Sequence, residues 1–259
     1  MASTLRNIWA VASKELRGYF TSPVAWVMMG LFALIFGWFF VSYLTFFVRA
    51  SMQSAFGQGP QTMNINMELI RPLLGNASVL VLFLLPMVTM RTYSEEKRSG
   101  TIELLLTSPV TDFQIIMGKF LGAVALYVIM LAVTVVHLGL LFIYGNPEWK
   151  PIVTAYIGLL LLGSCFISLG LLISSLTKNQ IVAGMVTFAV FLMLWVITWI
   201  GSFSGPTVDK LAQYLSIIDH YDDFGKGVLD TTHVIYYLSF ITFGLFLTAK
   251  SVDSERWRG

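Results

Sequence analysis

Long apolar runs, separated by short polar segments, are the main pattern along this chain. Residues 24–48 include no Asp, Glu, Lys or Arg, and a helix of that length crosses about 30 Å of hydrocarbon with some tilt. Five later runs are also strongly apolar, at residues 73–90, 114–144, 152–176, 181–200 and 234–248. The pattern predicts an all-α integral membrane protein with six transmembrane helices. The last run is short for a span, so that helix is expected to begin within the preceding loop.

The segment before the first span has a helical period of its own. In residues 4–20, Leu5, Ile8, Trp9 and Ala12 recur at helical spacing, with basic and polar residues elsewhere around the helix. This predicts an interfacial helix lying on the membrane. The alternative is a disordered basic tail. A cleaved signal peptide does not fit, because the next apolar run is too long and lacks an Ala-x-Ala site.

The longest charged interruption lies between the second and third spans. Residues 94–107 are predicted to form one short amphipathic helix, with Ile102 on an apolar face and Glu96 and Glu103 on the other. Ser108-Pro109 ends it, and Thr111 with Gln114 has the capping-box pattern that starts the next helix. The alternative is a solvated loop whose amphipathicity is incidental. Two further polar segments, 49–72 and 202–233, are predicted to be structured loops on the opposite side, the second partly helical.

Composition and charge agree with a membrane protein. Only 12% of the residues are charged, 56% are hydrophobic and the mean hydropathy is +0.77, whereas soluble domains carry about 25% charged residues. Cationic residues favour an orientation with both termini inside, because eleven lie on that side and five on the other. The eleven are Arg6, Lys14, Arg17, Arg91, Lys97, Arg98, Lys119, Lys178, Lys250, Arg256 and Arg258, and the five are Arg49, Arg71, Lys150, Lys210 and Lys226. The basic pI is explained by these loop charges, so no nucleic-acid partner is expected.

Catalytic and ligand-binding motifs are missing from the sequence. The Gly-Lys pairs at 118–119 and 225–226 lack the glycine spacing and the following Ser or Thr of a phosphate-binding loop. Neither HExxH nor CxxC occurs, and the single Cys165 cannot form an internal disulfide. We therefore expect neither enzymatic activity nor a bound cofactor or metal in this chain.

A few residues have two interpretations. His137 lies deep in a span, which suggests function, but a neutral histidine bonded to a nearby hydroxyl such as Thr134 is favoured. Asp and His residues between 219 and 230 could collect a cation such as Ca²⁺, but a solvated acidic face is favoured. The twelve Met residues are scattered without paired His or Cys, which favours packing over copper delivery.

The charged segment resembles the cytoplasmic coupling loop of ABC-2 type ABC transporter permeases, in the subgroup of gliding-motility (Gld-type) and nitrous-oxide-reductase maturation permeases. The matching residues are Arg91, Glu95, Glu96, Gly100, Thr101, Glu103, Leu105, Leu106, Pro109, Gly118 and Lys119. The resemblance covers nearly the whole chain as a single ABC-2 transmembrane domain, residues 1–259. It implies that the coupling helix docks on a separate cytoplasmic ATPase subunit that carries ATP and Mg. The residues expected to make this contact are Glu95, Glu96, Arg98, Gly100, Thr101, Glu103, Leu105 and Pro109.

The same resemblance implies a bacterial inner-membrane protein with both termini inside the cell, which pairs with a second permease chain through spans one and five. The pair would be a homodimer or a heterodimer, and would export a substrate. One alternative is a mechanotransmission subunit that drives a periplasmic or auxiliary membrane partner without transport. Another is an ATP-independent channel or carrier, which predicts midplane charges and repeat symmetry. For that reading the sequence offers only His137 and no visible repeat.

Overall fold

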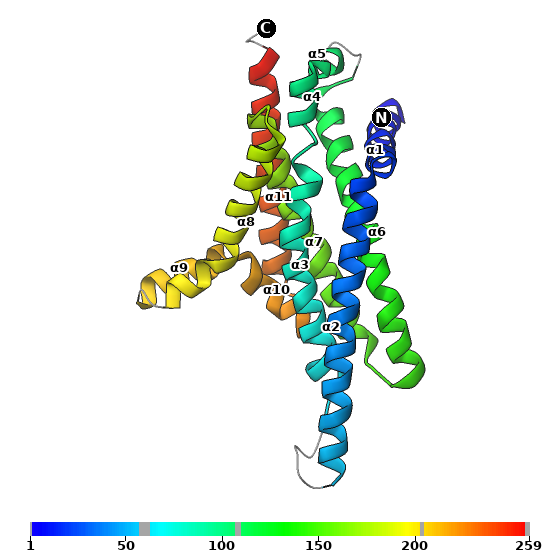
Figure 1. The fold of residues 1–259 in the computed structure, drawn as a ribbon. Helices are drawn as coiled ribbons and strands as arrows, with labels where there is room; N and C mark the ends of the chain where they lie inside the picture. Colours follow the sequence, from blue (N-terminus) through cyan, green and yellow to red (C-terminus); the bar gives the residue numbers. More distant parts are fainter. Residues whose placement is uncertain (1, 57–62, 107–109, 203–204, 257–259) are drawn as a thin grey trace.

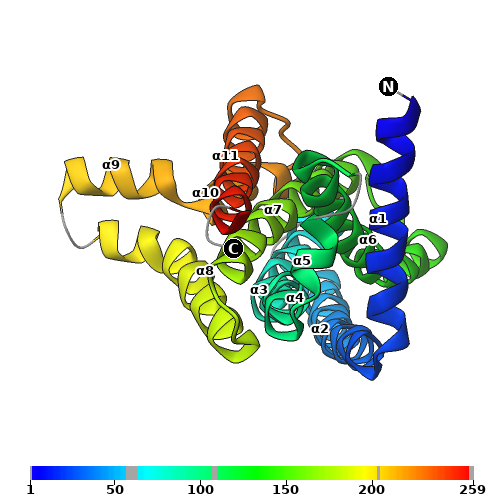
Figure 2. The ribbon, with the colours of Figure 1, turned by 90° about the horizontal axis from the view of Figure 1, so that it is seen from above.

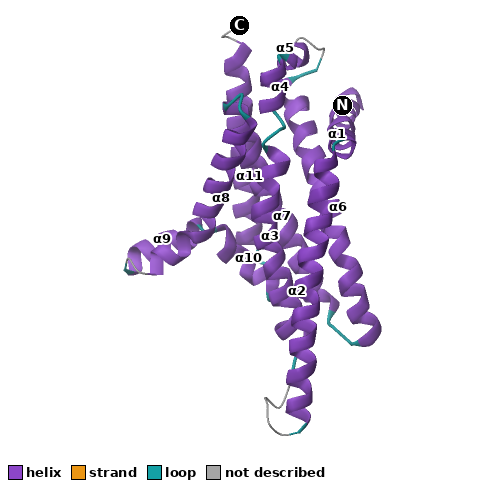
Figure 3. Cartoon of the chain, viewed as in Figure 1, coloured by secondary structure: helices purple, strands orange, loops and turns teal. Residues whose placement is uncertain are grey.

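The computed structural model describes residues 2–56, 63–106, 110–202 and 205–256. Within these ranges the regular structure is helical, without a strand (Figure 3). Six helices there are long and apolar enough to span a membrane: Pro23–Ala55, Asn66–Ser99, Asp112–Tyr144, Trp149–Leu176, Gln180–Ile197 and Thr231–Ser254. The predicted all-α protein with six transmembrane helices is therefore confirmed.

The helices follow one another along the chain. In order they are α1 (Ala2–Thr21), α2 (Pro23–Ala55), the π-helix η1 (Asn66–Ile70), α3 (Arg71–Thr89), α4 (Ser94–Ser99), α5 (Thr101–Leu106), α6 (Asp112–Tyr144), α7 (Trp149–Leu176), α8 (Gln180–Ser202), α9 (Pro206–Leu215), α10 (Ile217–Gly225) and α11 (Thr231–Arg256).

The long helices form an elongated bundle (Figure 1). Helices α4 and α5, helix α1 and the end of α11 all lie at one end of it, and α2 reaches farthest at the other. Helix α1 runs crosswise to the bundle, and Figure 2 shows it along its length beside α6. Helix α9 projects sideways from the end of α8.

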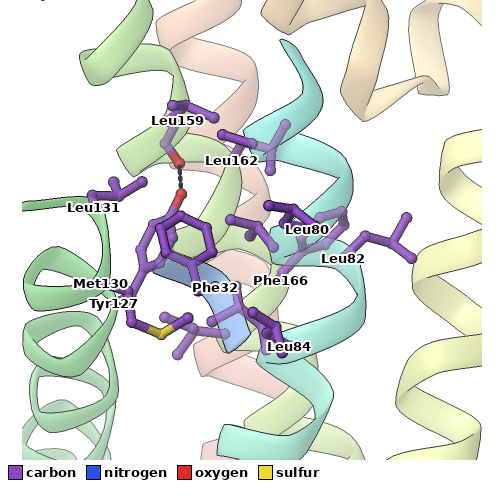
Figure 4. Packing of buried hydrophobic residues seen from close by; sticks show 14 of the residues in the cluster. Phe32, Leu80, Leu82, Leu84, Tyr127, Met130, Leu131, Leu159, Leu162 and Phe166 are labelled. Carbon is purple, nitrogen blue, oxygen red and sulfur yellow. Dashed lines mark hydrogen bonds between the residues drawn. The ribbon is translucent and has the colours of Figure 1, made fainter. Parts of the chain in front are cut away.

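Helices α3 and α7 form the centre of the bundle. Their apolar windows are 67% and 72% buried, against 28%, 17% and 22% for the spans formed by α2, α8 and α11. Helices α6 and α7 approach closely because Gly163 of α7 faces the bulky Tyr127 of α6. A Cβ on Gly163 would lie 2.2 Å from the Tyr127 ring. The Tyr127 hydroxyl donates to the Leu159 carbonyl at 2.7 Å (Figure 4). The remaining spans thus leave most of their apolar surface for lipid or another chain.

Two helices are longer than the hydropathy predicts. Helix α2 was expected at 24–48 but continues to Ala55, and η1 occupies part of the expected loop 49–72. Helix α11 covers Thr231–Arg256 instead of 234–248. Apolar content marks the part of a helix suited to hydrocarbon, whereas the helix itself continues until a turn residue stops it. The polar segment 202–233 was predicted to be partly helical, and it contains α9 and α10.

Candidate coupling site

The charged segment after α3 forms two short helices instead of the predicted single helix over 94–107. Helix α4 ends at Ser99, and Gly100 adopts a left-handed backbone with φ of 73° before α5 begins. Glycine accepts this conformation without a steric penalty, which is why it commonly terminates helices. The Ser99 hydroxyl lies at this turn, with its oxygen 2.9 Å from both the Glu95 carbonyl oxygen and Thr101 Oγ1.

Helix α4 is attached to α7 through its first backbone groups. The backbone N–H groups of Tyr93 and Ser94 donate to Ser174 Oγ at 3.0 and 3.1 Å. The Ser174 hydroxyl in turn donates to the Met90 carbonyl at 3.1 Å. The first N–H groups of a helix lack partners within it, so this buried serine from α7 satisfies them. The start of α4 is thereby held against the centre of the bundle.

A buried lysine joins α4 to two more helices. Lys119 of α6 is 1% exposed, and its Nζ lies 2.9 Å from Glu15 Oε1 of α1 and 2.8 Å from Glu96 Oε1 of α4. It also donates to the Thr92 carbonyl at 3.0 Å. Lys14 of α1 lies 3.4 Å from the same Glu96 oxygen. We call Lys14, Glu15, Glu96 and Lys119 the Lys119 cluster.

The Lys119 ammonium donates all three of its N–H groups, two of them to carboxylates. A buried charge with that many partners is tolerated, whereas the loss of one partner leaves the others uncompensated. The cluster therefore makes α1, α4 and α6 depend on one another.

Helix α1 lies against α6 at the level of this cluster. A Cβ on Gly118 would lie 2.5 Å from Val11 Cβ, and one on Gly122 would lie 2.8 Å from Glu15 Cβ. These two glycines let the helix backbones approach closely. The capping box predicted at the start of α6 is present, with Thr111 and Gln114 each bonded to the other's backbone N–H.

The predicted contact residues divide into outward-facing and inward-facing groups. Glu95, Arg98, Gly100, Thr101 and Glu103 are exposed. Glu96 instead turns inward to Lys119, which gives it a partner inside this chain. Of the remaining two, Leu105 lies in α5 and Pro109 lies outside the described residues. Their role towards an ATPase stays a prediction.

Sequence reasoning missed the partners of Lys119. Lys119 and Glu15 are separated by 104 positions, and a single sequence gives no indication of such a pairing. The available signal was a lysine placed beside glycines near the start of an apolar run.

His137 does not bond to Thr134 as expected. Its Nδ1 lies 3.3 Å from the Val133 carbonyl oxygen, and the ring makes edge contacts with Phe36 and Phe40 of α2. Thr134 instead pairs with the Tyr156 hydroxyl of α7 at 2.6 Å. The cause is geometric, since Thr134 faces α7 while His137 faces α2.

Two acidic residues of α10, Asp222 and Asp223, lie beside basic side chains. Asp222 lies 2.7 Å from Arg71 and 2.8 Å from Lys226, while Asp223 lies 2.8 Å from Lys226 and 3.0 Å from His233. The hydrogen bond from Lys226 lowers the pKa of Asp223. Among the described residues, no group of three or more His, Cys, Asp or Glu is arranged to hold a metal ion. We call Arg71, Asp222, Asp223, Lys226 and His233 the α10 cluster.

Among the described residues, six candidate spans and an exposed, charged two-helix element at one end of the bundle define a multi-pass helical membrane protein. The family described as ABC-2 family transporter protein matches residues 9–249, so the chain belongs to that family and is an ABC transporter permease.

The chain also resembles a curated protein over part of its length. It is 34% identical over 93 residues to the probable multidrug ABC transporter permease YbhR, in Escherichia coli K12 and in E. coli O157:H7. The aligned part is 36% of this chain and spans a quarter of the length of that relative.

Proposed function

We propose that this chain is the permease subunit of an ATP-driven exporter in a bacterial inner membrane, acting with a second permease chain and a separate ATPase that binds ATP and Mg. Family membership supports the ATPase partner in general terms. The relative YbhR is a probable multidrug ABC transporter permease, which favours export over force transmission. Within the family, the charged motif favours the gliding-motility and nitrous-oxide-reductase maturation subgroup.

The observation that carries the proposal is that α4 is exposed on one side and bonded to the bundle on the other, with α5, which exposes Glu103, directly after it. Glu95, Arg98 and Glu103 face outward, where a partner can reach them. Glu96 and the first N–H groups of α4 face inward, to Lys119 and Ser174. Movement of the ATPase surface would therefore displace α4 together with α6 and α7.

The orientation follows from charge and from the position of the ends. Helix α1, the end of α11 and α4–α5 lie at the same end of the bundle, and the side to which they were assigned carries eleven of the sixteen cationic residues (Figure 1). We infer that this end is cytoplasmic, with both termini inside.

The second permease chain would cover α2 and α8. These helices expose large apolar side chains along their length, including Leu34 and Trp38 of α2 and Met185 and Met193 of α8. The apolar composition of this surface suits contact with lipid and with a second membrane chain equally. The family resemblance favours a second chain on part of it.

Force transmission to a periplasmic or auxiliary subunit is the second candidate. One feature favours it: α2 continues past the predicted span to Ala55 and exposes Met52 and Phe56 there. An apolar helix surface beyond the membrane would serve to bind such a partner.

Co-purification with ABC-type ATPases of the same organism, co-expressed with this chain, tests the proposal. The informative variant is Glu95→Arg with Glu103→Arg, because both side chains are exposed and lie outside the Lys119 cluster. The matched control is Lys150→Glu, which changes an exposed charge at the opposite end. We expect the wild type and the control to retain the ATPase and the double variant to lose it. If the wild type retains no ATPase in mild detergent, the proposal is wrong.

A further inference from the structure

A cavity of about 370 Å³ lies at the elbow between α1 and α2, and none of the roles described above uses it. It is bounded by α1, α2, the end of α3, α4 and one residue of α6. The apolar part of its lining is Val24, Ala25, Met28, Met87, Val88 and Leu126, and the charged part is Lys14, Glu15, Arg91, Glu95 and Glu96. The cavity is thus apolar on one side and charged on the other.

Its position is that of a lipid headgroup. The elbow is the point where the crosswise helix α1 meets the first span, which begins at Pro23 (Figure 2). The apolar lining of α2 lies within that span, while Glu95 and Glu96 lie beyond the end of α3. Amphipathic helices of this kind lie at the boundary between headgroups and acyl chains. A molecule in the cavity would therefore meet charges at headgroup level and apolar side chains below it.

The charges of the lining favour a zwitterion over an anion. Two cations, Lys14 and Arg91, face three carboxylates, and Lys119 behind the lining pairs with two of those carboxylates. With Lys119 included there are three charges of each sign, so the site is neutral overall. An anionic lipid would need an excess of cations, as at polybasic membrane sites. Arg91 Nε lies 3.2 Å from Glu95 Oε2, so a headgroup that carries both signs meets a cation and a carboxylate side by side.

The hydrogen-bonding groups favour a primary ammonium. Glu95 presents an exposed carboxylate on the cavity lining, and Glu96 Oε2 beside it is buried without a hydrogen-bond partner among the described residues. A primary ammonium can donate to the Glu95 carboxylate, whereas the quaternary ammonium of phosphatidylcholine has no N–H to donate. On the other side of the cavity, Arg91 donates to Ser22 Oγ at 3.2 Å, and its guanidinium suits a phosphate.

We propose that this cavity binds the headgroup of a phosphatidylethanolamine-class phospholipid, with its ammonium at Glu95 and Glu96, its phosphate at Arg91 and an acyl chain along Met28 and Met87. A lipid bound there would join α1, α3 and α4 at the same level as the Lys119 cluster. The proposal does not involve the transported substrate; Glu95 and Glu96 are also in the predicted ATPase contact, so the binding test uses the permease without an ATPase.

Native mass spectrometry of the delipidated full-length protein tests it, with titration by dioleoyl lipids that carry ethanolamine, choline or glycerol headgroups. Gly18→Trp is the blocking variant, because Gly18 lines the cavity and a Cβ there meets no atom within 4 Å. Ala10→Trp, at an exposed position of α1 outside the cavity, is the matched control. We expect the wild type and the control to bind the ethanolamine lipid about tenfold more tightly than the other two, and Gly18→Trp to lose that preference.

A second variant keeps the test decisive if the tryptophan disturbs folding. Glu95→Gln removes one carboxylate from the cavity, and Glu103→Gln removes one that is exposed outside it. The first should lower the preference for ethanolamine over choline and the second should not. Equal binding of the ethanolamine and choline lipids by the wild type, or tighter binding of the glycerol lipid, would overturn the proposal.

Discussion

The Lys119 cluster and the α10 cluster both pair carboxylates with basic side chains, but one is buried and the other is exposed. Lys119 is 1% exposed and joins three helices that are far apart in sequence. In the α10 cluster the side chains of Asp222 and Lys226 are 51% and 41% exposed, and they lie four residues apart. Exposed pairs contribute about 0–1 kcal/mol, whereas removal of one partner from a buried pair costs about 3–5 kcal/mol. Burial, and not the number of ion pairs, thus distinguishes the charges that connect helices.

The largest effect is expected for Lys119→Met. This change leaves Glu15 and Glu96 close together without their buried cation, and should destabilise the protein by about 3–5 kcal/mol. Thermal unfolding in detergent measures it, with Lys150→Met as the control. Adding Glu15→Gln and Glu96→Gln to the variant should restore part of the loss. An unchanged melting temperature for Lys119→Met would show that the cluster does not hold the helices together.

A smaller effect is expected for Gly118→Ala. The new Cβ would lie 2.5 Å from Val11 Cβ and 3.1 Å from the Ile8 carbonyl oxygen, so α1 must move away from α6 at a cost of about 1–3 kcal/mol. The matched change at the other cluster is Gly225→Ala, where the nearest atom is Arg71 Cγ at an ordinary 3.7 Å. Thermal unfolding should separate the two variants. Equal melting temperatures would mean that α1 is loosely attached.

The smallest effect is expected at the α10 cluster. The hydrogen bond from Lys226 lowers the pKa of Asp223, so the carboxylate contributes stability above its unfolded pKa, and this is lost as the pH falls through the lower folded value. Because the pair is exposed, the acid-induced change should be slight, and it should become smaller in Lys226→Met, where Asp223 keeps its hydrogen bond with His233. Melting temperature as a function of pH measures it. If acid lowered the melting temperature strongly in the wild type and not in Lys226→Met, this cluster would contribute as much stability as the Lys119 cluster.

The sequence was informative where structure depends on local or compositional signals. Six spans followed from charge-free runs, and the start of α6 followed from Thr111 and Gln114, because three-residue spacing is sufficient to define a capping box. The break at Gly100 was missed, because a single glycine inside an amphipathic pattern is compatible with both one helix and two. The partners of Lys119 were also missed, since contacts over such sequence distances depend on how the helices pack.

The central claim is that the Lys119 cluster makes α1 and α4 move as one unit with α6. The most direct test is a spin-label distance measurement between Leu5→Cys of α1 and Ser99→Cys of α4, both exposed and outside the predicted ATPase contact, in protein whose Cys165 is replaced by Ala. The distribution should be narrow, should stay the same when the ATPase partner binds ATP, and should broaden when Lys119→Met is added. A distribution that is already broad with Lys119 present, or that shifts on ATP binding, would contradict the account.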